Sequence, residues 1–77
     1  MVVHSALVQA KAAAALRRSI RRYFRYRKES TQQSVNDLLK RIEHAKQTAL
    51  TVGIPPVDVQ SMMNFEIERC KGRTTKA

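Results

Sequence analysis

The stretch from Ser5 to Lys28 contains no glycine or proline, and alanine fills position 10 and positions 12 to 15. Alanine has the highest helix propensity of the amino acids, and glycine and proline are the residues that most often break helices. At 100° per residue, four large apolar side chains share one side of such a helix with Ala13: Leu16, Ile20, Tyr23 and Phe24. The sequence therefore predicts a long amphipathic helix over about 5–28.

Basic side chains lie on the adjoining side of this predicted helix, and no acidic residue precedes Glu29. A helix face that meets only solvent usually mixes acids with bases, whereas an unmixed basic face favours an anionic partner. We therefore predict that these side chains bind a partner: Arg17, Arg18, Arg21, Arg22, Arg25 and Lys28.

A second helix is expected after a short polar connection at 29–33. Ser34 is its predicted N-cap, and Asp37 would favour the positive end of the helix dipole. Gly53 suits the left-handed backbone that commonly ends a helix. Between these limits the apolar residues keep helical spacing: Val35, Leu38, Leu39, Ile42, Ala45, Ala49 and Leu50.

A third, short helix is predicted after Pro55 and Pro56, which cannot continue the second one. Asp58 is its expected N-cap, the helix should run to about Lys71, and Gly72 should end it. Its apolar side is expected to consist of five residues: Val59, Met62, Met63, Ile67 and Cys70.

These segments predict an all-α fold, a small three-helix arrangement with a long basic helix, a second helix and a short third helix. It would form one domain of 77 residues with loose ends at 1–4 and 73–77. A chain of this length buries only about 60% of the surface that its unfolded form exposes, so we expect a thin core that a partner surface completes. The expected core residues of the first two helices are Leu16, Ile20, Leu38, Leu39 and Ile42.

Residues that carry catalysis or hold metal ions are scarce in this chain. The single cysteine, Cys70, excludes an internal disulfide and makes no plausible zinc set with His4 and His44. Two glycines are too few for a glycine-rich phosphate loop. We therefore predict that the protein is not an enzyme, binds no metal and has no cofactor of its own.

The charge balance restricts the kind of partner without selecting one. Fifteen Lys and Arg residues against six Asp and Glu residues give a net charge of +9, which suits nucleic acid, an acidic protein or an anionic membrane. No apolar run reaches the roughly 18 residues that a transmembrane helix needs. An amphipathic, arginine-rich and acid-free N-terminus is typical of mitochondrial targeting, so we expect the mitochondrial matrix or the matrix face of the inner membrane.

The hexapeptide IRRYFR, from Ile20 to Arg25, resembles a pattern of the LYR-motif proteins, which are small mitochondrial three-helix proteins. These proteins carry an Ile/Val-Arg pair, two variable residues, a phenylalanine and then basic residues. The resemblance continues through RKESTQQSVNDLLKRIEHAKQTAL and covers about 16–52. Four residues lie at the distances from Phe24 found in the LYR-type accessory subunit of respiratory complex I: Val35, Asp37, Leu38 and Leu39.

This chain differs from the family in the tripeptide after which the family is named. In the family, Leu-Tyr-Arg opens a first helix well upstream of the phenylalanine. Here Leu16-Arg17-Arg18 stands instead, eight residues before Phe24 and inside the same predicted helix. The chain therefore resembles a shortened member that lacks the family's first helix.

The resemblance implies a partner. Family members bind the mitochondrial acyl carrier protein through basic side chains, and the acyl chain of the carrier inserts between their helices. Carried over to this chain, Arg21, Arg22 and Arg25 would contact the acidic helix of the carrier. Phe24 would line the tunnel for an acyl chain that the partner carries on its phosphopantetheine.

We thus expect a non-catalytic accessory subunit or assembly adaptor of a large mitochondrial complex, with respiratory complex I as the first candidate. The alternative is a mitochondrial ribosomal or RNA-associated protein that places the same arginines on rRNA phosphates. Binding to a membrane surface is a third hypothesis. It is less favoured, because the apolar stripe of the first helix is rich in alanine and lacks tryptophan.

Overall fold

The computed structural model describes the backbone of residues 5–75 and the side chains of residues 5–72. Within this range the chain forms three helices and no strand: α1 (Ala6–Tyr26), α2 (Gln32–Thr51) and α3 (Pro56–Thr75). The predicted all-α class is confirmed. The expectation of loose ends falls in large part on 1–4 and 76–77, which lie outside the described residues.

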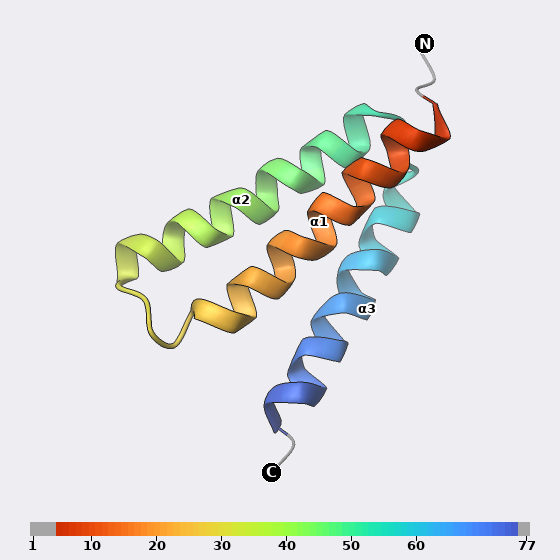
Figure 1. Ribbon diagram of the computed structural model, residues 1–77. Coiled ribbons are helices and arrows are strands. Elements are labelled where there is room, and N and C mark those ends of the chain that lie inside the picture. The colour runs from red at the N-terminus through yellow and green to blue at the C-terminus, as the bar shows by residue number, and fades with distance from the viewer. Residues whose placement is uncertain (1–4, 76–77) are drawn as a thin grey trace.

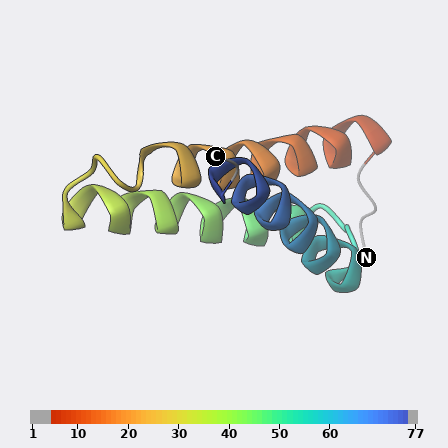
Figure 2. The ribbon, with the colours of Figure 1, turned by 90° about the horizontal axis from the view of Figure 1, so that it is seen from below.

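The first helix holds the arrangement together. α1 and α2 form an antiparallel hairpin, and α3 crosses this hairpin at an angle (Figure 2). α1 packs along both α2 and α3, whereas α2 and α3 contact each other little and diverge from their short connection (Figure 1). Each of the later helices therefore depends mainly on α1 for its place.

The first two helices begin at hydroxyl caps. The Oγ of Ser5 accepts a hydrogen bond from the backbone N–H of Val8 at 3.3 Å and starts α1. The predicted cap of α2 at Ser34 is wrong, because Thr31 takes that position and its Oγ1 accepts from the Ser34 N–H at 3.2 Å. Thr31 supplies the same chemistry three residues earlier, so the helix gains almost one turn at its start.

The third helix is longer than predicted. It begins at Pro56 rather than after Asp58 and continues through Gly72 to Thr75. Proline is well tolerated at the first helical position, where its missing N–H would have no helical partner, and the carbonyl of Pro55 accepts from the N–H of Asp58 at 2.9 Å. A single glycine costs a helix only about 1 kcal/mol, which does not stop this one.

The turn between α2 and α3 uses glycine as predicted. Gly53 has a φ of +96°, a conformation that favours residues without a Cβ. A Cβ at Gly53 would also lie 3.2 Å from Nε2 of Gln9. That amide donates to the backbone carbonyl of Val52 at 3.1 Å and ties the start of α1 to this turn.

The core follows the apolar side of α1. Leu16 and Ile20 are 0% and 1% exposed, as predicted. Ile42 is partly buried against the core and Leu38 is half-buried, but the predicted core position of Leu39 is wrong, because its side chain is 46% exposed. Leu39 lies about 100° around the helix from Leu38, so both cannot face α1. The remaining buried hydrophobic residues are Ala12, Ala45, Ala49, Val52, Val59 and Cys70.

The apolar side of α3 agrees with its predicted spacing. Val59 and Cys70 are buried, and three further side chains pack partly buried against the core: Met62, Met63 and Ile67.

Among the described residues, no helix is both long enough and apolar enough to cross a membrane.

Replacing Leu16 by Ala should lower the free energy of unfolding by about 3 kcal/mol, because it leaves a cavity where α1 meets the core. Leu39→Ala removes the same atoms from a half-exposed site and should cost less than about 1 kcal/mol. Urea unfolding followed by circular dichroism measures both changes. Equal losses for the two variants would contradict the packing described.

Candidate functional site

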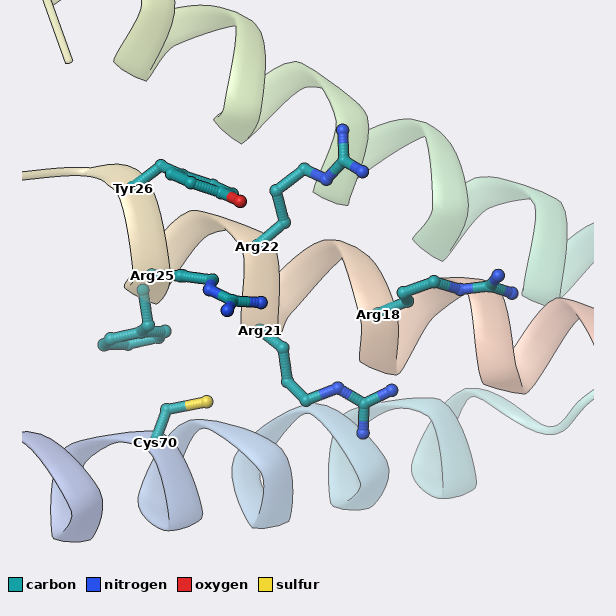
Figure 3. Close-up of a pocket in the computed structure, with 7 residues that line it drawn as sticks. Arg18, Arg21, Arg22, Arg25, Tyr26 and Cys70 are labelled. Carbon is teal, nitrogen blue, oxygen red and sulfur yellow. The ribbon is translucent and has the colours of Figure 1, made fainter. Parts of the chain in front are cut away.

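The basic side of α1 forms an open groove of about 520 Å³. We call it the arginine groove, and its lining is Arg18, Arg21, Arg22, Phe24, Arg25, Tyr26 and Cys70. Helical spacing of α1 brings six of these residues together, and Cys70 reaches the groove from α3 (Figure 3). The sequence predicted the shared face of α1, but not that α3 contributes to it.

The six predicted partner-binding side chains separate into two groups. Arg18, Arg21, Arg22 and Arg25 line the arginine groove. Arg17 lies at the seam between α1 and α3, where its Nη1 donates to Sδ of Met62 at 3.8 Å. Lys28 is exposed beyond the end of α1 and is not part of the groove lining.

The arginines of the groove differ in direction. Arg21 extends from α1 toward α3, whereas Arg22 extends toward α2 (Figure 3). The guanidinium of Arg25 lies 5.8 Å from the ring centre of Tyr26, a cation–π contact. Among the side chains that the structure describes, no acid lies within ion-pair distance of Arg18, Arg22 or Arg25. These three charges are therefore available to an anion from outside.

Phe24 is predicted to line an acyl tunnel. In the structure its side chain lies between the core and neighbouring side chains of α1 and its C-cap. Its ring packs partly buried against the core and meets the Tyr23 ring edge-on, with centres 5.3 Å apart. The guanidinium of Arg27 lies 4.7 Å from the centre of the Phe24 ring and 5.9 Å from that of Tyr23. Sequence reasoning missed Arg27, although its position three residues after Phe24 places it one turn along the same face.

The most unusual residue near the groove is Glu66 of α3, which is 0% exposed. Its Oε2 lies 3.7 Å from Nη1 of Arg21, its Oε1 lies 3.8 Å from Nη1 of Arg69, and neither oxygen has a hydrogen-bond partner. Glu66 was not among the residues predicted from the sequence. The signal was its spacing, four residues after Met62 and four before Cys70, which places a carboxylate on the apolar side of α3.

The chemistry of the groove suits the binding of anions. Arginine presents planar, always-charged donors that grip carboxylate and phosphate groups with two parallel hydrogen bonds. Phe24 and Tyr26 add an apolar surface between these donors. Among the described residues no group of His, Cys, Asp and Glu could hold a metal ion. The absence of enzymatic activity and of a cofactor stays a prediction.

Comparison with known proteins gives no match: no family model fits the chain, and neither the curated proteins nor the solved structures contain a detectably similar one. The resemblance to the LYR-motif family therefore rests on the residues from about 16 to 52 that were named above.

Arg27→Ala should lower the free energy of unfolding by about 0.5–1 kcal/mol, because it removes the cation that covers the Phe24 ring. Lys28→Ala is the matched control, since it removes the same charge from an exposed neighbour. Urea unfolding of both variants checks the difference. If the two losses are equal, the stacking of Arg27 does not stabilise the end of α1.

Proposed function

We propose that the chain is a non-catalytic docking protein, an accessory subunit or assembly adaptor of a large mitochondrial complex, with respiratory complex I as the first candidate. The observation that carries this proposal is the arginine groove, in which Arg18, Arg22 and Arg25 have no acidic partner among the described side chains while Phe24 supplies an apolar surface. Such a groove fits a partner that is acidic and also has an apolar part to bury.

The geometry of α1 favours a helical acidic partner. From Arg18 to Arg25 the helix rises by about 10 Å, which is two turns. Carboxylates one turn apart on a partner helix can therefore meet successive arginines of the groove. Contacts of this kind steer and orient the encounter, and the apolar surface then supplies burial that a small domain lacks.

The mitochondrial acyl carrier protein is the partner that the resemblance to the LYR-motif family implies. Its acidic helix would lie along Arg21, Arg22 and Arg25, and its acyl chain would enter beside Phe24. The carrier would bring this chain on its own phosphopantetheine, so the docking protein needs no cofactor. A matrix location, or the matrix face of the inner membrane, follows from this partner.

One observation favours RNA as a second candidate. Tyr26 is 45% exposed, and the guanidinium of Arg25 lies beside its ring. Exposed aromatic rings and arginines together are a common platform for stacking bases, while the remaining arginines of the groove would contact phosphates. In this case the chain would belong to the mitochondrial ribosome or to another RNA-containing assembly.

Replacing Arg21, Arg22 and Arg25 together by Gln should weaken binding to the acyl-loaded carrier protein at least tenfold, because the charged contacts are lost. The matched control replaces Lys11, Lys40 and Arg41 by Gln, which lowers the net charge equally at exposed positions outside the arginine groove. Isothermal titration calorimetry measures both affinities. Equal weakening by the two triple variants would mean that net charge, not the groove, drives binding.

Salt dependence separates the carrier protein from RNA. Binding to RNA releases counterions, so the logarithm of its affinity should fall linearly with the logarithm of salt concentration, by roughly 0.7–0.9 for each phosphate contacted. Binding to the carrier should fall less steeply, because the buried acyl chain contributes independently of salt. The acyl carrier protein would be rejected as the partner if the chain bound a short rRNA helix tightly, with a steep dependence on salt, and did not bind the carrier.

A further inference from the structure

Glu66 is the one charged side chain that is buried among the residues whose side chains are described. Both of its cationic neighbours, Arg21 and Arg69, lie more than 3.6 Å from its oxygens, beyond the range of charge-assisted hydrogen bonds. Removing a carboxylate from water is unfavourable, and attraction to cations at these distances offsets only part of the desolvation free energy. Fold stability alone therefore does not account for an acid at this position.

The position of Glu66 relates it directly to the arginine groove. Its Oε2 pairs with Arg21, whose side chain is still 44% exposed and lines that groove. Glu66 also lines a neighbouring groove of about 520 Å³ between α1 and α3, together with Arg17, Ser61, Met62, Phe65 and Arg69. The carboxylate is thus the buried neighbour of an arginine that an external acid would approach from the solvent.

The extension of Arg21 toward α3 fits this pairing (Figure 3). Because Glu66 is on α3, this contact forms only while α3 is packed against α1. An external carboxylate that binds Arg21 must share the guanidinium with Glu66, and the two negative charges repel each other. The internal acid therefore lowers the attraction of the groove for any single acidic side chain.

We infer that Glu66 is an internal competitor for the arginine groove, which holds Arg21 in the free chain and sets the affinity of the groove for acidic partners. This inference rests on the proposed function of the groove as an acid-binding surface. Competition by Glu66 favours a partner surface with several carboxylates one turn apart, because such a surface can engage the other arginines of the groove as well as Arg21. A lone carboxylate is disfavoured.

The test compares Glu66→Gln with Glu68→Gln. Both changes raise the net charge equally, but Glu68 is exposed on α3 and has no ion pair with Arg21. Glu66→Gln should bind the acyl-loaded carrier protein about fivefold more tightly, the size expected for one partly exposed charge pair. Glu68→Gln should change the affinity less than twofold. Equal gains, or weaker binding by a folded Glu66→Gln chain, would overturn the inference.

A double variant assigns the effect to Arg21. In a chain that already carries Arg21→Gln, the further change Glu66→Gln should leave the affinity unchanged, because the contested guanidinium is gone. A fivefold gain that persists in this background would show that Glu66 acts elsewhere and would also overturn the inference. Circular dichroism melting checks that every variant is folded.

The wild-type chain supplies a readout that does not depend on the carrier protein. The probe is a synthetic helical peptide with four glutamates on one face, added to the labelled protein in an NMR titration. The carboxyl carbon of Glu66 should shift as Arg21 is drawn away, while that of Glu68 stays in place. If the carrier fails to bind but the peptide moves the Glu66 signal, the acyl carrier protein is not the partner, whereas the groove still binds acids and the inference stands. A Glu66 signal that stays fixed while the peptide binds would reject the inference.

Discussion

The packing of Leu16 and Ile20 at the centre of the molecule is the interaction on which the rest depends. Both side chains are fully enclosed, and they belong to the one helix that packs along both of the others. Since α2 and α3 contact each other little, each of them is held in place mainly by its contacts with α1. A single helix therefore holds together a domain that is already near the lower limit of size for stable folding, although α2 and α3 also contribute buried residues to its core.

The same helix also carries the cations that define the arginine groove. Because its apolar side is fixed between α2 and α3, its basic side presents Arg18, Arg22 and Arg25 in a constant register. The helix backbone that carries these arginines is already formed before a partner binds, which lowers the entropy lost on association. α3 adds a second influence through Glu66, which places an acid against the inner side of Arg21. Packing and recognition are thus coupled through two helices.

Much of this architecture could be predicted from the sequence, because helical periodicity and the positions of Gly53 and Pro55 report local structure directly. The failures arose where local signals compete. Two hydroxyl residues could cap α2, and the earlier one did. Leu39 and Leu38 are equally apolar, and only the packing on α1 decides which one is buried. Spacing places Glu66 on the apolar side of α3, but its contact with Arg21 could not be predicted, because Arg21 is on another helix.

The most direct test of the account is to identify what the arginine groove holds in its native setting. The tagged chain would be purified from gently solubilised mitochondria, with and without RNase, and the co-purifying proteins identified by mass spectrometry. The account predicts an acyl carrier protein together with subunits of a respiratory complex, in amounts that RNase does not change. Ribosomal proteins that are lost after RNase treatment would contradict it, because the arginines would then hold RNA.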